Sequence, residues 1–336
     1  MRTWMGLGLA ALVALAGGCG DDGDTSPEAT VEAAFSVTPD EGTRLTDFEF
    51  DAGSSLPSGQ GLEFRWDWEG DGTWDTDWST STAAGHRYSL YQGSAIDTLD
   101  VTLEARKGAR HDTVSAEIAV DARHGHIVES LPLELPDVDA LGTDGAYLWT
   151  TEWHAYTGHG ALHKIDPATG DTLLSLATPD LWPGGVTSDG EHLCTVGYLK
   201  LWKLDPVTGA EISHFDVVYS AYSAGLAWDG ESFFYGSWKS ASGGDGHIHK
   251  YAADGTHLLD FPSPHGSETP HGVAYDGQHL WVTTEIDDSL FVVDPATGSV
   301  LTSVHVASDI GPVTVLGDYV WCVSTEMGRH LVRIVP

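Results

Sequence analysis

The stretch VTSDGEHLCTVGYLKLWKLDPVTGAEISHF, residues 186–215, contains one full copy of a repeated unit. It consists of four short runs rich in apolar residues, separated by an Asp-Gly turn, a loop and an Asp-Pro-x-Thr-Gly turn. Asp-Gly favours a tight hairpin because a type I′ turn requires positive φ. Pro fixes φ and Gly closes the second turn. The stretch therefore predicts four consecutive antiparallel strands.

The same unit recurs over residues 126–336. The glycines of its first turn are 40 to 47 residues apart, and they are Gly145, Gly190, Gly230, Gly277 and Gly317. Four strands per repeat of this length are typical of a propeller blade. The repeat therefore predicts a five-bladed β-propeller.

The last copy of the unit ends at HLVRIVP, after its third strand. The missing strand is found at the other end of the repeat region, where VDARHGHIVESLPL (120–133) aligns with VDPATGSVLTSVHV (293–306). We expect this N-terminal strand to close the final blade, because closure removes two exposed strand edges.

Residues 32–121 show a different pattern, with short alternating strands separated by Gly, Pro, Asp and Ser. Several short strands in about ninety residues indicate a β-sandwich. The segments AAFSVTPDEGT, FDAGSS, FRWDWEGDGTWDT and DTVSAEIAV resemble the PKD family of immunoglobulin-like domains. This resemblance implies an extracellular spacer or binding module.

The turns of the repeat region, such as GLAWDGESFF and DPATGSVL, resemble those of YVTN-type and glutamine-cyclotransferase-like propellers. Only scaffold turns match, so the resemblance carries no catalytic residues to this chain. The expected fold is all-β, with a PKD-type β-sandwich followed by a five-bladed β-propeller over residues 122–336, closed by an N-terminal strand.

The first 19 residues resemble a bacterial lipoprotein signal peptide. Arg2 precedes an apolar run over residues 4–18, which is too short for a comfortable transmembrane helix. Small residues precede Cys19, although Ala16 stands where the lipoprotein pattern prefers Leu. We expect lipidation of Cys19, with an ordinary cleaved signal as the alternative. Residues 20–31 are polar and predict a flexible tether. The expected location is the bacterial cell envelope, at the outer membrane or cell surface.

The formal net charge is -35, with only 15 Lys and Arg residues. Such a surface repels phosphate backbones and excludes nucleic acid as an expected partner. The expected partners are the membrane, through the lipid anchor, and an extracellular or periplasmic protein, peptide or carbohydrate. Cys194 and Cys322 belong to blades that are not adjacent, so we expect two free buried thiols.

One face of the propeller collects the loops between second and third strands and the loops between blades. These loops carry aromatic, His and acidic residues, whereas the turns of the other face carry Asp, Gly and Pro. We therefore predict the ligand site on the loop face. The candidate acid–base residues are His154, His271, Glu285 and Glu326. The candidate ligand-binding residues are Glu152, Trp153, His159, Trp182, Tyr222, Trp238 and His265. A solvated acidic rim and packing between blades are the alternative roles for these residues.

Two further patterns concern metals. His247 and His249 have strand spacing, but two ligands do not make a zinc site, so we expect packing or a surface position. The stretch RWDWEGDGTWDTDW (65–78) places Asp67, Glu69, Asp71 and Asp75 at calcium-loop spacing. The closing Glu of such a loop is replaced by Trp78. We expect a β-hairpin there, with Ca²⁺ as an addition to it.

Three functions compete. The first is a membrane-anchored binding module that uses the loop face of the propeller, with the sandwich as spacer. The second is a propeller enzyme of the lyase or glutamine-cyclotransferase-like type that uses rim His and Glu residues. The third is a structural or assembly role.

Overall fold

The computed structural model describes residues 30–58, 61–91, 93, 95–135, 137–152, 160–179, 182–197, 199–217, 223–237, 246–264, 269–284, 288–306, 308–324 and 329–336. The predicted leader, Cys19 and almost all of the predicted tether therefore lie outside the described residues. The regular elements of the described part are all strands, β1 to β27. Within these ranges no helix has the length and apolarity needed to cross a membrane. The all-β prediction is confirmed.

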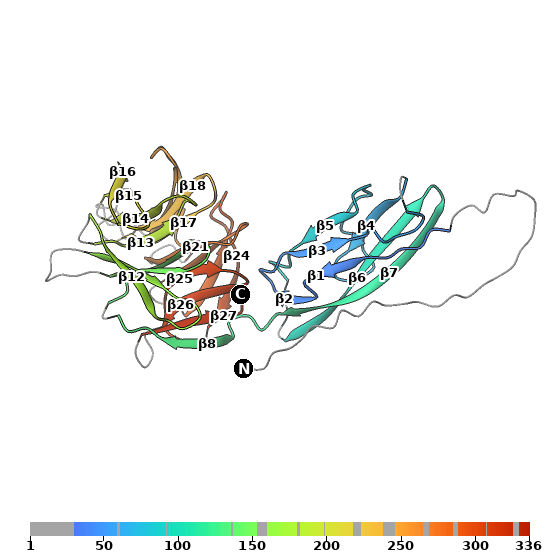
Figure 1. The fold of residues 1–336 in the computed structure, drawn as a ribbon, viewed down its shortest axis with the longest axis horizontal. Helices are drawn as coiled ribbons and strands as arrows, with labels where there is room; N and C mark the ends of the chain where they lie inside the picture. Colours follow the sequence, from blue (N-terminus) through green and yellow to red (C-terminus); the bar gives the residue numbers. More distant parts are fainter. Residues whose placement is uncertain are drawn as a thin grey trace, which may run out of the picture.

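Residues 30–122 form two sheets that face each other (Figure 1). One sheet has the order β1 (Ser36–Thr38), β3 (Phe48–Asp51), β5 (Ala83–His86). The other has the order β2 (Glu41–Thr43), β7 (Arg110–Asp121), β6 (Ile96–Lys107), β4 (Glu63–Asp67). Apolar and acidic residues alternate along β3, so one face of the strand points into the core. Phe48 and Phe50 are buried, whereas Glu49 and Asp51 are exposed.

The core between these sheets is aromatic. Trp66 and Trp68 stack with their ring centroids 5.1 Å apart and an interplanar angle of 8°. Phe50 packs against both indoles. The alternating tryptophans of the calcium-like stretch are therefore mainly core residues of the sandwich.

The predicted hairpin at 65–78 is wrong in one respect. Trp74 does not begin a second strand, and β4 pairs instead with β6. The returning chain is irregular. It contacts β4 through the Phe64–Ser79 bridge, through hydrogen bonds to the backbone of Trp66, and through two indoles that lie against the Arg65 guanidinium. Asp67 explains the difference, because its carboxylate accepts the backbone N–H groups of Gly70, Asp71 and Gly72 and so holds a loop.

The repeat region forms five sheets of four strands. The first is β9 (Ala140–Thr143), β10 (Leu148–Glu152), β11 (Ala161–Ile165), β12 (Thr172–Ala177). The second is β13 (Gly185–Ser188), β14 (Leu193–Gly197), β15 (Lys200–Leu204), β16 (Glu211–Asp216). The third is β17 (Ser223–Trp228), β18 (Ser232–Ser237), β19 (His247–Ala252), β20 (His257–Pro262). The fourth is β21 (Pro270–Tyr275), β22 (Leu280–Thr284), β23 (Ser289–Val293), β24 (Val300–His305).

The fifth sheet contains β25 (Ile310–Leu316), β26 (Tyr319–Ser324) and β27 (His330–Ile334), and its outer strand is β8 (Ile127–Pro132). β8 pairs antiparallel with β27, and Glu129 lies opposite Arg333. The segment that sequence alignment assigned to this position therefore occupies it.

The first strand of each sheet contacts the first strand of the next, and β25 contacts β9, so the sheets form a closed ring. Glycine permits the close approach of these inner strands. A Cβ on Gly142 would lie 1.8 Å from the Val186 carbonyl oxygen, and one on Gly225 would lie 2.1 Å from the Val273 nitrogen. Gly225 also has a φ of 72°, a conformation that other residues rarely adopt.

The sandwich packs against the Asp276-Gly277 turn of the fourth sheet and the Gly317-Asp318 turn of the fifth. Arg87 Nη1 donates to the Asp276 carbonyl at 2.5 Å, and Ser89 Oγ donates to Gln278 Oε1 at 2.9 Å. Thr43 Oγ1 donates to the Asp318 carbonyl at 2.6 Å. The two parts of the chain are thus joined by side-chain contacts as well as by the strand connection.

Cys194 and Cys322 are buried free thiols, as predicted. Burial raises the pKa of both thiols far above the ordinary range, so both stay protonated at neutral pH. They act as small apolar side chains in two different core clusters.

Candidate functional site: the loop face, a central cavity and an acidic loop

The second strand of each sheet ends at the loop face, opposite the Asp-Gly turns. Most of the loops that follow these strands lie outside the described residues. Eight of the predicted site residues therefore cannot be placed, namely Trp153, His154, His159, Tyr222, Trp238, His265, Glu285 and Glu326. The described candidates of this face are Glu152, Trp182 and His271.

Glu152 is not the exposed rim carboxylate that its position in the sequence predicted. Its side chain is buried at the end of β10, and its Oε2 lies 2.7 Å from His163 Nε2 on β11. Burial of a carboxylate requires a partner of this kind, because an isolated charge in the interior is costly. The prediction failed because the pattern TTE does not reveal that the neighbouring strand offers an imidazole.

His163 continues the chain of contacts outward. Its Nδ1 lies 2.8 Å from Ser175 Oγ on β12, so Ser175, His163 and Glu152 cross three strands of one sheet. A hydrolytic triad would need the imidazole, oriented by the carboxylate, to reach a nucleophile beside oxyanion donors. Here the hydroxyl lies on a regular outer strand, opposite His163 in the sheet register. The arrangement can share a proton, and it ties the three strands together.

His271 and Trp182 are the other two candidate residues of the loop face that the structure describes. His271 lies near the loop-face end of β21, and its Cε1 is 3.3 Å from the place that a Cβ on Gly311 would occupy. It is therefore positioned between two inner strands, near the centre of the ring. Trp182 precedes β13 and is 43% exposed. An exposed indole and an inner-strand imidazole on the same face suit a stacking ligand with polar groups.

The inner strands also enclose a cavity of about 320 Å³ at the opposite, Asp-Gly end. Thr143, Thr187, Trp228, Tyr275 and Thr314 are among its lining residues, and each comes from a different sheet. Sequence reasoning placed no site here, because Asp-Gly turns look purely structural. The signal that could have revealed it is the recurrence of a Thr or aromatic residue at the end of each inner strand.

Two aspartates at the edge of this cavity form ion pairs with lysines of the same chain. Asp144 is 3.0 Å from Lys164 Nζ, and Asp189 is 2.9 Å from Lys203 Nζ. Burial alone would raise the pKa of Asp189, but hydrogen bonds from Lys203 and from the backbone of His192 and Glu191 lower it to about 2. These carboxylates stabilise their turns and offer no spare charge to a cation.

The acidic loop of the sandwich brings three of the four predicted calcium ligands together. Oxygen atoms of Asp67, Glu69 and Asp75 lie within 4.8 Å of one another. Asp71 is outside this group, and its Oδ1 accepts the Thr73 N–H instead. Burial and the neighbouring carboxylates raise the pKa of Glu69. Converging carboxylates with a raised pKa fit a hard cation with oxygen ligands.

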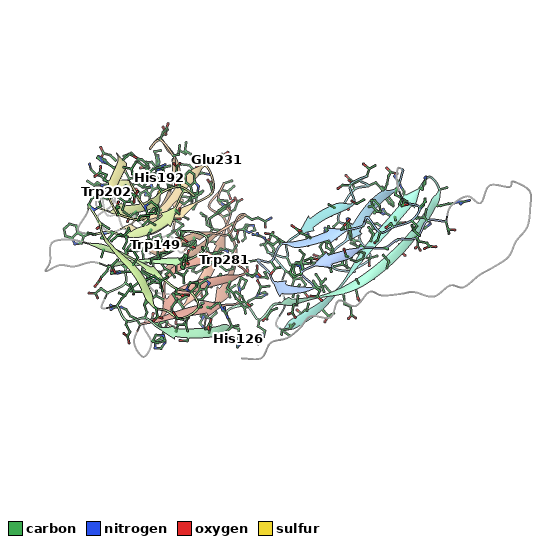
Figure 2. All side chains as sticks on the ribbon, viewed as in Figure 1. His126, Trp149, His192, Trp202, Glu231 and Trp281 are labelled. Atoms are coloured by element: carbon green, nitrogen blue, oxygen red, sulfur yellow. The ribbon has the colours of Figure 1, made fainter. Side chains whose placement is uncertain are left out.

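Figure 2 shows the side chains of both parts of the chain, with Trp149 and Trp281 inside the propeller. Comparison with known proteins supports this part of the fold. No family model matches the chain. A glutaminyl cyclase from Myxococcus xanthus is similar in structure over 62% of this chain and 94% of its own, with a TM-score of 0.50 and 13% sequence identity. The propeller domain of Cps50 (Swd1) from Myceliophteria thermophila matches 72% of this chain and 96% of its own, at a TM-score of 0.39 and 14% identity. The first likeness supports a β-propeller in this chain, and at this identity it shows the fold alone.

Proposed function

We propose that this protein is an exported lipoprotein, anchored through Cys19, that binds a ligand with the loop face of a five-bladed propeller. In this proposal the sandwich is a PKD-type spacer between the membrane and the propeller. The ligand is a protein, peptide or carbohydrate of the cell envelope or its surroundings.

The observation that carries the proposal is the position of the sandwich on the propeller. Arg87, Ser89 and Thr43 donate hydrogen bonds to the turns that join the first and second strands of two sheets. A sandwich held there does not cover the opposite ends of the sheets. The loop face, with Trp182 and His271, is thus available to a large partner. An anchor that precedes the sandwich would present this face away from the membrane.

An enzyme of the lyase or glutamine-cyclotransferase-like type is the second candidate. It is favoured by the 2.7 Å contact between His163 and Glu152, because a base beside a carboxylate is what proton transfer needs. Both side chains are less than 10% exposed, at 7% and 5%. A substrate would have to reach an imidazole that is buried in this way, so binding without chemistry is the better-supported function.

The experiment for the binding face compares two exposed aromatic residues at opposite ends of the propeller. Trp182 lies at the loop face, and Tyr147 (36% exposed) follows the Asp-Gly turn of the first sheet. The chain is applied to arrays of bacterial glycans and of envelope peptides. We expect Trp182→Ala to lose the binding that the wild type and Tyr147→Ala retain. Equal binding by all three proteins would show that the loop face is not the site.

The anchor has its own test. We expect Cys19→Ser to move the protein from the detergent phase to the aqueous phase and to abolish incorporation of labelled palmitate in the bacterial cell. If the variant still partitions with membranes, lipidation of Cys19 is refuted while the binding proposal is unaffected.

A further inference from the structure

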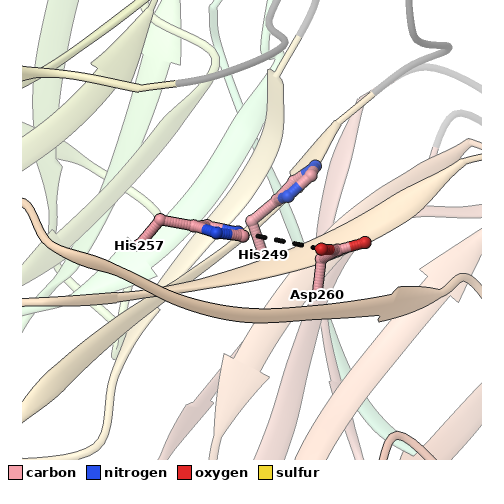
Figure 3. A group of neighbouring side chains, drawn as sticks. All are labelled: His249, His257 and Asp260. Atoms are coloured by element: carbon pink, nitrogen blue, oxygen red, sulfur yellow. Dashed lines mark ion pairs between the residues drawn. The ribbon is translucent and has the colours of Figure 1, made fainter.

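The outer half of the third sheet gathers three histidines and an aspartate on one face. Figure 3 shows His249 on β19 and His257 and Asp260 on β20, with the imidazole of His257 directed toward the Asp260 carboxylate. One ligand atom from each of these residues lies within 4.8 Å of the other two. His247 joins them, since its Nδ1 is 2.9 Å from Asp260 Oδ2.

Strand register explains this gathering. His249 lies directly opposite Asp260, and His247 and His249 share a face because side chains alternate along a strand. His257 is three residues before Asp260 and would point to the other face of a regular strand. A register shift between Lys250 and Tyr251 places His257 opposite Tyr251, on the same face as Asp260.

The other sheets provide an internal comparison, because each has the same register shift. The positions of His249, His257 and Asp260 are taken by His163, Thr172 and Ser175 in the first sheet and by Trp202, Glu211 and His214 in the second. In the fourth they are taken by Phe291, Val300 and Ser303, and in the fifth by Val332, Ile127 and Ser130. Only the third sheet has a metal-ligating residue type at all three positions together with a histidine at the His247 position.

We propose that His249, His257, Asp260 and His247 bind one divalent transition-metal ion of the zinc class. Imidazole nitrogens with one carboxylate are the ligands that Zn²⁺ accepts in four-coordinate sites. Bonds of about 2.0–2.1 Å put tetrahedral ligand atoms roughly 3.3 Å apart. The His247–Asp260 contact at 2.9 Å and the His257 Nε2–Asp260 Oδ1 contact at 3.9 Å lie on either side of that spacing. Small side-chain rotations would therefore complete the site.

The surroundings of His249 support its role as a ligand. Ser237 Oγ lies 2.8 Å from its Nε2, and an N–H donated from Nε2 to this hydroxyl would leave Nδ1 as the coordinating nitrogen. His257 and Asp260 are exposed, so an ion can enter from solvent.

The ion would join β20, the outermost strand of its sheet, to β19. It would act as a clamp on an exposed strand edge, and it would make the stability of this sheet depend on metal. This proposal is independent of the loop-face function, because the cluster lies on the outer strands of one sheet.

The test uses the full chain, purified without a polyhistidine tag and stripped with a chelator. Zn²⁺ is titrated by calorimetry in excess Ca²⁺, which occupies the carboxylate sites, and Co²⁺ replaces Zn²⁺ for visible absorption. We expect one equivalent of Zn²⁺, a rise in melting temperature, and a Co²⁺ spectrum with nitrogen ligands. His257→Ala and Asp260→Asn, which are exposed and should fold, are expected to bind at least about tenfold more weakly.

His214→Ala is the matched control, because His214 occupies the Asp260 position of the second sheet and contacts Glu211 at 2.6 Å. We expect this variant to bind Zn²⁺ like the wild type. The proposal is overturned if the wild type takes up no stoichiometric Zn²⁺, or if His257→Ala and Asp260→Asn retain wild-type affinity.

Discussion

The guanidinium carbon of Arg44 in the sandwich lies 5.8 Å from the ring centroid of Trp281 in the propeller. Arg44 is fully buried, and its Nε donates to the carbonyl of the last residue, Pro336, at 3.1 Å. Burial lowers its pKa to about 10, and the nearby Asp276 opposes that shift. The arginine therefore stays charged at neutral pH. Although it belongs to the sandwich, it places a positive charge beside the fourth sheet of the propeller.

Comparison of the five sheets explains why a positive charge lies beside Trp281. Trp281 is on the second strand of the fourth sheet. In each of the other four sheets, the residue that pairs with the equivalent second-strand position is cationic, and these residues are Lys164, Lys203, Lys250 and Arg333. In the first three of these sheets the lysine pairs with the aspartate of the Asp-Gly turn. In the fourth sheet that residue is Val292, opposite Trp281. Arg44 thus replaces the missing cation, and Leu45 packs in the same core cluster as Val292.

Arg44→Ala should destabilise the chain by about 3 kcal/mol, because it removes a buried cation and leaves its partners without it. It should also loosen the sandwich from the propeller. Urea unfolding measures the first effect, and limited proteolysis of residues 122–126 measures the second. Arg106→Ala is the control, since Arg106 also lies over an indole, that of Trp78, and pairs with a carboxylate, that of Glu63, but both charged side chains are more than a third exposed, at 35% and 40%. We expect it to cost less than about 1 kcal/mol. Equal effects of the two variants would contradict the role of Arg44.

The stability of the sandwich should fall in mild acid because of His86. Its imidazole stacks on Trp68 at a centroid distance of 4.7 Å, and burial lowers its pKa to about 4 although Asp75 opposes the shift. The unfolded chain binds this proton below the ordinary pKa of 6.5, whereas the folded chain does so only near 4. The free energy of unfolding therefore decreases as pH falls through that window.

His86→Phe keeps the aromatic stack and removes the proton site. We expect the variant to lose less stability than the wild type between pH 6.5 and pH 4 in urea unfolding. His249 has a similarly lowered pKa and adds to the slope of both proteins, so the difference between them isolates His86. Parallel pH profiles would mean that His86 is not the group responsible.

The sequence alone predicts the strands of the propeller well, because Asp-Gly and Asp-Pro-x-Thr-Gly turns are local signals. It also places the closing strand, since residues 120–133 repeat the pattern of residues 293–306. It could not reveal the contact of Arg44 with Trp281, because a single Val292 in one repeat does not say which distant residue compensates. It singled out His247 and His249 but predicted packing or a surface position for them, and it missed His257 and Asp260. The register shift that turns His257 toward the other three has no separate sequence signal.

The buried pair in the first sheet predicts a strong asymmetry between neighbouring substitutions. His163→Ala removes the partner that Glu152 Oε2 contacts at 2.7 Å in the interior, and we expect it to cost about 3 kcal/mol. Ser175→Ala removes the outer hydroxyl, whose strand position is exposed, and should cost less than about 1 kcal/mol. Chemical denaturation measures both. If His163→Ala were as mild as Ser175→Ala, Glu152 would not depend on the imidazole.

Calcium should stabilise the sandwich through the acidic loop. A ligand present at about 100 times its dissociation constant adds roughly 2.7 kcal/mol to the folded state. Burial and the charges of Asp75, Asp67 and Asp71 raise the pKa of Glu69. In a chelator, the folded chain therefore holds this proton more tightly than the unfolded chain does. The stability that this proton contributes is lost as pH rises from 4.5, the ordinary pKa of a Glu carboxyl, through the raised pKa of Glu69.

Glu69→Gln consequently has opposite effects in the two conditions. In chelator at neutral pH it should be at least as stable as the wild type, because a crowded charge is gone. In Ca²⁺ it should be less stable than the wild type, because a calcium ligand is gone. A second variant, Asp71→Ala, tests whether the fourth predicted ligand joins the site when Ca²⁺ binds. Glu49→Gln, on the exposed side of β3, is the control and should respond to Ca²⁺ like the wild type. A melting temperature of the wild type that ignores Ca²⁺ would refute the site, since carboxylates this close gain most from a shared cation.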